Sequence, residues 1–231
     1  INWKNQYQKL SMDLKAIDIK SPSKKTLLTE IQKLFPAKGI FISKIIVTRG
    51  ESQTGYDFNE GIKPTRILLK IDFNTNKYEI FKKGVRLTAS NIRATKSSNS
   101  GIKDLNRLEN VLARKSISRN FFDAIMVDSN GNICDCARSS LFIRFGSRLY
   151  TASNTSFGIH GVTKKIICKN EKKLNLTIDH SPLTLNQLEK ADEVIVSNSI
   201  FGALQVVRFK NTKWEKGNLA NSITNLLNES N

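Results

Sequence analysis

The stretch Gly101-Ile-Lys-Asp-Leu-Asn-Arg-Leu-Glu109 places one lysine, Lys103, between a polar loop and the expected first turn of a helix. Apolar residues at helical spacing predict that helix: Leu105, Leu108, Val111 and Leu112. The positive end of a helix disfavours an ammonium group, so Lys103 would be neutral part of the time and could act as a nucleophile. The alternative is a solvated loop lysine, since most loop lysines are solvated.

The composition bounds the class of protein. The 231 residues suit one large domain or two modest ones, and 39% of them are hydrophobic, which is ordinary for a globular chain. No apolar run approaches the length that crosses a bilayer, and the first residues are too polar for a signal peptide. We therefore expect a cytoplasmic protein with no membrane partner.

The chain is strongly basic, with a formal net charge of +17. Such a charge is compatible with a nucleic-acid partner. However, the lysines are dispersed along the whole sequence, and no basic segment is interleaved with stacking aromatic residues. We expect no specific nucleic-acid partner, although the charge would attract an anionic small-molecule substrate.

Cysteines and histidines are sparse. Cys134, Cys136 and Cys168 are an odd number without a secretory signal, which is typical of a reducing cytosol. His160 and His180 show no metal-ligand spacing, and a structural zinc ion needs four ligands. We expect no metal site, and two histidines do not support a Ser-His-Asp triad.

Periodicity and turn residues predict the elements of the chain. The predicted helices are residues 2–18, residues 24–35, a segment after Lys103, a segment opening at Gly161 and the tail from Asn218. The predicted strands are residues 41–48, 66–73, 78–81, 85–89, 122–128, 132–136, 141–145, 193–196 and 203–207. Ser23 is the expected cap of the second helix, and Asn130-Gly131 predicts a hairpin turn.

Short strands mixed with helices indicate an α+β protein in two parts. Asn74-Thr-Asn76 reads as a turn and as a candidate boundary between the parts. We therefore expect a small N-terminal domain over residues 1–74 and a larger domain over residues 75–231, which would carry Lys103.

Asp135 is a carboxylate in an otherwise apolar predicted strand. Aspartate is depleted from strand interiors, so an edge or turn position is one explanation. If the carboxylate is buried, it needs a cationic partner. A protonated pyridine nitrogen would serve, as it does in pyridoxal enzymes.

Two further segments are candidate ligand loops. In Gly158-Ile-His-Gly-Val-Thr163, the amides of Val162 and Thr163 would be free donors at a helix start and could bind phosphate; an ordinary capped helix start is the alternative. In Ser197-Asn-Ser-Ile-Phe-Gly202, a strand ends in small polar residues, which suits either a ligand or a plain turn.

These segments together carry a resemblance to a known family. The matching pieces are Thr48-Arg-Gly with Gly55-Tyr56, Gly101 to Glu109, Phe142, Gly158 to Thr163 and Ala191 to Gly202. The chain resembles the class IV, D-amino-acid-transferase-like pyridoxal phosphate enzymes, and most closely the aminodeoxychorismate lyases among them. The resemblance implies a small N-terminal α/β domain, a larger strand-rich, barrel-like domain, and a homodimer. The family's opening strands have no counterpart ahead of Ile1, for which truncation, disorder and loss are open explanations.

The resemblance also implies roles for single residues. Lys103 would bind pyridoxal phosphate covalently and then act as acid and base. Asp135 sits where the family places a glutamate against the pyridine nitrogen, and Ser140 where it commonly has asparagine. The implied phosphate-binding residues are Val162, Thr163, Ser199 and Lys9, the last at the position of a family arginine. The implied substrate-binding residues are Tyr56 and Asn198.

The activity implied first is elimination of pyruvate from aminodeoxychorismate, which leaves 4-aminobenzoate for folate synthesis. Two alternatives stay open. One is a class IV aminotransferase acting on D- or branched-chain amino acids, and the other is a catalytically degenerate relative that keeps the fold.

Overall fold

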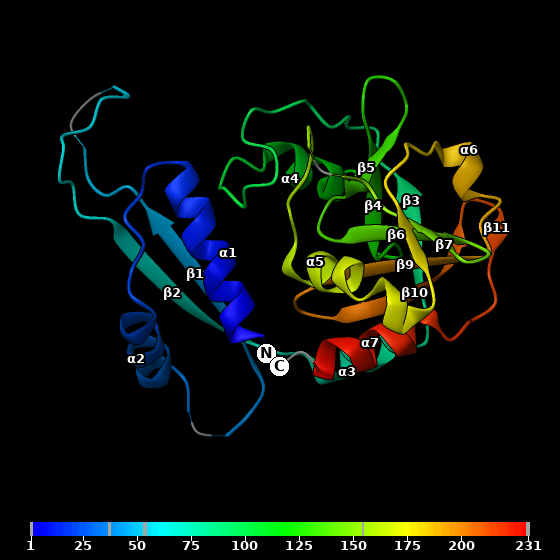
Figure 1. Cartoon of the computed structure of the whole chain (residues 1–231), viewed down its shortest axis with the longest axis horizontal. Coiled ribbons are helices and arrows are strands. Elements are labelled where there is room, and N and C mark those ends of the chain that lie inside the picture. Colours follow the sequence, from blue (N-terminus) through cyan, green and yellow to red (C-terminus); the bar gives the residue numbers. More distant parts are fainter. Residues whose placement is uncertain (1, 37, 53–54, 154, 230–231) are drawn as a thin grey trace. The chain divides into compact units, whose positions relative to one another are not determined.

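The computed structural model describes residues 2–36, 38–52, 55–153 and 155–229. The chain divides into two compact units, Asn2–Thr75 and Asn76–Asn231. Both units mix helices and strands, which confirms the predicted α+β class (Figure 1). In the described part of the chain, no helix combines the length and the apolar character that crossing a bilayer requires.

The first unit consists of two helices followed by a hairpin. Its elements are α1 (Trp3–Ala16), α2 (Lys24–Leu34), β1 (Phe41–Thr48) and β2 (Thr65–Asp72). The predicted cap is confirmed, because Ser23 Oγ accepts a hydrogen bond from the backbone N–H of Thr26 at 3.0 Å. β1 and β2 are antiparallel, with Phe41 opposite Asp72 and Thr48 opposite Thr65.

The second unit is built on a nine-stranded sheet with the order β5-β4-β3-β10-β9-β6-β7-β8, in which β11 also pairs with β10. Its strands are β3 (Val85–Ala89), β4 (Asp123–Val127), β5 (Ile133–Cys136), β6 (Ser140–Phe145), β7 (Arg148–Tyr150), β8 (Thr177–Asp179), β9 (Glu193–Asn198), β10 (Gly202–Phe209) and β11 (Thr212–Lys213). Its helical elements are α3 (Thr75–Lys82), α4 (Leu108–Lys115), α5 (Val162–Lys169), η1 (Glu171–Leu174), α6 (Leu185–Leu188) and α7 (Leu219–Glu229).

Two apolar clusters lie on opposite faces of this sheet. Leu141 and Ile143 of β6 belong to one cluster, whereas Phe142 belongs to the other, which includes residues of α5 and α7. This alternation is the period of two that a strand imposes on its side chains. Ser140 therefore shares a face with Phe142, on the side of the sheet that α5 covers.

The strand predicted over residues 78–81 is wrong, because α3 occupies that segment. Tyr78 and Phe81 are three residues apart, so a helix brings both onto one side. There, Phe81 meets Phe122 edge-on with 4.9 Å between ring centroids, and Tyr78 stacks on Phe201 at 6.3 Å. The predicted turn at residues 74–76 is also corrected, since the helix begins at Thr75. Packing outweighed the strand preference of the aromatic residues.

The helix expected directly after Lys103 begins later than predicted, at Leu108. The side chain of Asp104 explains the delay, because its Oδ1 accepts a hydrogen bond from the backbone N–H of Asn106 at 3.1 Å. Such a local bond competes with helix formation. Lys103 therefore lies in the segment before the helix, and the expectation that the helix dipole of α4 acts on its amine was wrong.

Candidate functional site

Lys103 lies beside the segment that leads into α5. Gly101 forms a parallel bridge with Ile159. The N–H of Gly101 donates to the carbonyl of Gly158 at 3.0 Å, and the N–H of His160 donates to the carbonyl of Gly101 at 2.9 Å. These bonds bring two segments that are far apart in sequence next to each other, with Lys103 two residues beyond the bridge.

Glycine is required at position 101. Its φ is +87°, and a β-carbon there would lie 2.9 Å from the His160 ring. The absence of a side chain thus allows the close approach of the two segments.

α5 begins as the sequence predicts, at Val162 after Gly161. Gly161 has no side chain that could cap the helix. The backbone N–H groups of Val162 and Thr163 at the helix start could therefore donate hydrogen bonds to an anion. Both residues are buried. A β-carbon on Gly161 would lie 3.6 Å from Ser140 Oγ, which places the start of β6 next to this helix start.

Asp135 is buried, with 9% of its surface exposed, although β5 is an edge strand of the sheet. Its Oδ1 accepts the backbone N–H of Leu141 at 2.6 Å, and its Oδ2 accepts the hydroxyl of Ser140 at 3.3 Å. The Lys164 ammonium of α5 lies 3.9 Å from Oδ2. The expected cationic partner is thus present within the protein itself, and Lys164 was not among the residues predicted from the sequence.

The end of β9 contributes further hydroxyl groups. Ser197 is paired with Ser140 across the sheet, is 2% exposed, and its Oγ has no hydrogen-bond partner among the described residues. Ser199 follows in the turn and is exposed. The sequence placed both serines in a candidate ligand loop but gave a phosphate-binding role to Ser199 alone.

Asn198 holds the turn that follows β9. Its Oδ1 accepts the N–H groups of Ile200 at 3.0 Å and of Phe201 at 2.9 Å. Its Nδ2 donates to the carbonyl of Arg138 at 3.4 Å. The side chain therefore shapes the loop, and its predicted contact with substrate stays a prediction.

Two predicted site residues belong to the first unit. Lys9 forms an ion pair with Asp13 one turn further along α1. Tyr56 lies in the segment between β1 and β2 and is fully exposed. Their assignments to the phosphate and to the substrate stay predictions.

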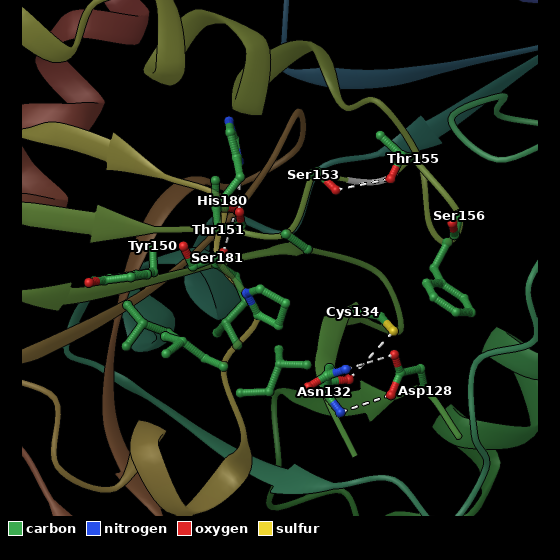
Figure 2. Close-up of a pocket in the computed structure, with 17 residues that line it drawn as sticks. Asp128, Asn132, Cys134, Tyr150, Thr151, Ser153, Thr155, Ser156, His180 and Ser181 are labelled. Atoms are coloured by element: carbon green, nitrogen blue, oxygen red, sulfur yellow. Dashed lines mark hydrogen bonds between the residues drawn. The ribbon is translucent and has the colours of Figure 1, made fainter. Parts of the chain in front are cut away.

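A separate cavity of about 140 Å³ lies in the second unit (Figure 2). None of the predicted site residues lines it. Cys134 does, and because side chains alternate along β5, Asp135 points to the other face. Burial is the main cause that raises the pKa of the Cys134 thiol to about 12, so this thiol is no nucleophile at neutral pH.

Two polar side chains labelled in Figure 2, Asp128 and His180, form hydrogen bonds within the protein. Asp128 Oδ1 accepts the backbone N–H groups of Asn130 and Asn132, which holds the predicted hairpin turn. His180 Nδ1 donates to the carbonyl of Thr151 at 2.8 Å. We conclude that these groups of the cavity wall have structural roles.

The residues gathered around the start of α5 fit pyridoxal phosphate by their chemistry. Lys103 supplies an amine, and Asp135 supplies a buried carboxylate for a ring nitrogen. The helix start and the buried Ser197 hydroxyl supply donors for a phosphate. A hydroxyl buried without a partner is costly unless a ligand satisfies it, which favours a ligand at this face.

Comparisons with known proteins agree with this chemistry. The family model described as "Amino-transferase class IV" matches residues 1–209. The aminodeoxychorismate lyase of Bacillus subtilis is 25% identical over 217 residues, which are 91% of this chain and 72% of the relative. The crystal structure of 4-amino-4-deoxychorismate lyase from Pseudomonas aeruginosa is 25% identical with a TM-score of 0.84, covering 99% of this chain and 85% of that chain.

In sequence, the curated aminotransferases match over a shorter stretch. The probable branched-chain-amino-acid aminotransferase of Thermotoga maritima is 28% identical over 127 residues, which are 54% of this chain and 46% of the relative. The chain thus spans about half the length of the curated aminotransferases that it matches. The family model nevertheless covers most of the sequence, and it agrees with the resemblance carried by the motifs. The chain belongs to the class IV aminotransferase family.

Proposed function

We propose that this protein is a 4-amino-4-deoxychorismate lyase that eliminates pyruvate from its substrate and leaves 4-aminobenzoate for folate synthesis. One observation carries the choice within the family. Similarity to the lyases extends over 91% of this chain, whereas similarity to the Thermotoga aminotransferase extends over 54%. In sequence, the lyase of Bacillus subtilis therefore resembles more of this chain than the Thermotoga aminotransferase does.

Pyridoxal phosphate is the cofactor that the family indicates, and when bound it supplies an electron sink for the reaction. In our proposal, the amides of Val162 and Thr163 bind its phosphate together with the hydroxyl of Ser199. Asp135 pairs with the ring nitrogen. The roles that the resemblance implies for Lys9 and Tyr56 stay predictions.

Lys103 performs the proton transfers of the proposed reaction. Its amine takes the proton from the ring carbon that bears the amino group, and the bond between the neighbouring ring carbon and the ether oxygen breaks, so that the oxygen leaves with the three-carbon group. Lys103 then returns the proton to the departing three-carbon group, which leaves as pyruvate. The ring of the product becomes aromatic, which favours the elimination. The effectiveness of Lys103 as a base depends on its position next to the α5 start.

The test is a product assay with purified protein, pyridoxal phosphate and aminodeoxychorismate. We expect 4-aminobenzoate and pyruvate in equal amounts, measured by chromatography and by a lactate dehydrogenase couple. Formation of neither product by protein that has bound the cofactor would reject the lyase assignment.

A class IV aminotransferase is the second candidate, because the aminotransferase relatives match the chain in sequence as well. The same preparation should be assayed with D-alanine or branched-chain amino acids and 2-oxoglutarate. Only an aminotransferase returns glutamate. A catalytically degenerate member would give no product in either assay.

The resemblance also predicts a homodimer, and this remains part of the proposal. Light scattering coupled to gel filtration should give about twice the 26.0 kDa mass of the chain. A monomeric mass would contradict this part of the proposal.

A further inference from the structure

Lys164 is buried in an environment that is unfavourable for a lysine. It is the third residue of α5 and only 6% exposed. The start of a helix carries a partial positive charge, so a cation in the first turn is disfavoured. Burial of the ammonium adds a cost of desolvation. The neighbouring Lys165 is exposed and avoids that cost.

The carboxylate of Asp135 is the acidic partner of Lys164, with 3.9 Å between Nζ and Oδ2. Burial by itself favours the neutral, protonated form of a carboxyl group. The nearby ammonium has the opposite effect and favours the ionised form. The bonds from Leu141 N–H and Ser140 Oγ fix the orientation of the same carboxylate.

We propose that Lys164 is a positioning residue for the ring of the cofactor: it holds Asp135 ionised and in place, so that the carboxylate can pair with a protonated ring nitrogen. This inference rests on the proposed function, because it assumes that pyridoxal phosphate binds at the α5 start. Lys164 acts through Asp135 and needs no contact with substrate.

The experiment compares two ligands of the cofactor-free protein. One is pyridoxal phosphate, and the other is its 1-deaza analogue, in which a C–H group replaces the ring nitrogen. The wild-type protein should bind pyridoxal phosphate about tenfold or more tightly than the analogue, as expected for a charge-assisted hydrogen bond. Equilibrium dialysis measures both dissociation constants.

The variants separate the role of Lys164 from general effects of charge. In Lys164→Met, the preference for pyridoxal phosphate should fall toward onefold, because Asp135 takes up a proton. Lys164→Arg, which keeps the positive charge, should retain the preference of the wild type. Lys165→Met, which removes a charge from the same helix turn, should leave the preference as in the wild type.

A double variant keeps the test decisive if Lys164→Met folds poorly. Asp135→Asn combined with Lys164→Met leaves no uncompensated buried charge. Its preference should equal that of Asp135→Asn alone, because Lys164 acts only through Asp135. A further loss of preference in the double variant would overturn the inference.

The possible failures are distinguishable. If Lys164→Met weakens the binding of both ligands equally, or keeps the wild-type preference, the inference is wrong. Binding of the cofactor by the wild type would still leave the proposed function standing. If the wild type binds neither ligand, the proposed function fails and the inference fails with it.

Discussion

At the scale of single residues, the reactivity of Lys103 has to come from its position, because the chain carries 37 lysines and arginines in all. Pairing of Gly101 with Ile159 holds the Lys103 segment beside the segment that leads into α5, and a fixed position of this kind raises the effective concentration of an amine toward a bound aldehyde. Borohydride reduction in the presence of pyridoxal phosphate should therefore give one modified lysine, Lys103, located by peptide mass spectrometry. Lys103→Ala should show no modified lysine and no turnover.

The matched control for this labelling is Lys96→Ala, which removes an exposed lysine from the preceding loop. It should leave the labelling of Lys103 unchanged. Labels scattered over many lysines would contradict a built site at Lys103.

A second prediction at this scale concerns Asp123 and the pH dependence of the free energy of unfolding. It is fully buried, and burial is the main cause that raises its pKa above the ordinary 3.8, against hydrogen bonds from Ser139 and Ala124. A raised pKa in the folded state means that the proton stabilises the fold. Its contribution is complete below pH 3.8 and is lost as the pH rises through the folded-state pKa.

The unfolding free energy of the wild type should therefore fall relative to Asp123→Asn as the pH rises through this window, measured by urea denaturation. Asp179→Asn is the control of opposite sign, since hydrogen bonds from Ser181 lower the pKa of Asp179. The contribution of Asp179 is lost as the pH falls. Parallel curves for the wild type and Asp123→Asn would contradict the assignment.

At the scale of elements, the contact between the segments around Gly101 and Ile159 can be tested with two glycines. Gly101 has φ +87°, and a β-carbon added there would lie 2.9 Å from the His160 ring, whereas Gly131 has φ +82° and a β-carbon there would meet nothing within 4 Å. Gly131→Ala should cost about 1 kcal/mol of backbone strain alone. Gly101→Ala should cost more, by about a further 1–3 kcal/mol for overpacking.

Urea denaturation measures both losses, and the additional substitution His160→Ala should recover part of the loss at Gly101. Equal losses of unfolding free energy at the two glycines would show that overpacking against His160 does not destabilise the Gly101→Ala variant.

The elements show where sequence patterns suffice and where they fail. The strand at Val85–Ala89 and the hairpin at Asn130-Gly131 were predicted because local apolar runs and turn residues dictate them. The helix α3 was missed because the side chains of Tyr78 and Phe81 favour strands locally and become helical through packing on Phe122 and Phe201. The start of α4 was misplaced because the Asp104 carboxylate accepts a hydrogen bond from the N–H of Asn106, a local interaction that competes with helix formation.

In the candidate site too, local sequence identified some residues, and others became apparent only from the tertiary structure. Lys103, Asp135 and Thr163 were selected from local motifs and from a resemblance. No role was predicted for the partners Lys164 and Ser197, since their importance arises from the pairing of β6 with β9 and from the packing of α5. Neither relation is visible in a stretch of neighbouring residues.

At the scale of the whole molecule, a ligand that binds only the folded chain should stabilise it. Pyridoxal phosphate at a hundredfold excess over its dissociation constant should add about 2.7 kcal/mol. For a chain of this size, the melting temperature should rise by about 5–10 °C. Differential scanning calorimetry measures the rise, and pyridoxal without phosphate should give a smaller one. Equal rises for both compounds would contradict a phosphate site at α5.

The bridge between Gly101 and Ile159 also has a consequence for the order of folding. Such a bridge closes a long loop, and contacts of high sequence separation form late because the entropy of loop closure is lost first. The segment that carries Lys103 and the segment that leads into α5 become neighbours only when the loop has closed. Retention of the cofactor would thus report that a newly made chain has completed its long-range topology, and a nascent chain that ends before α5 could not retain it.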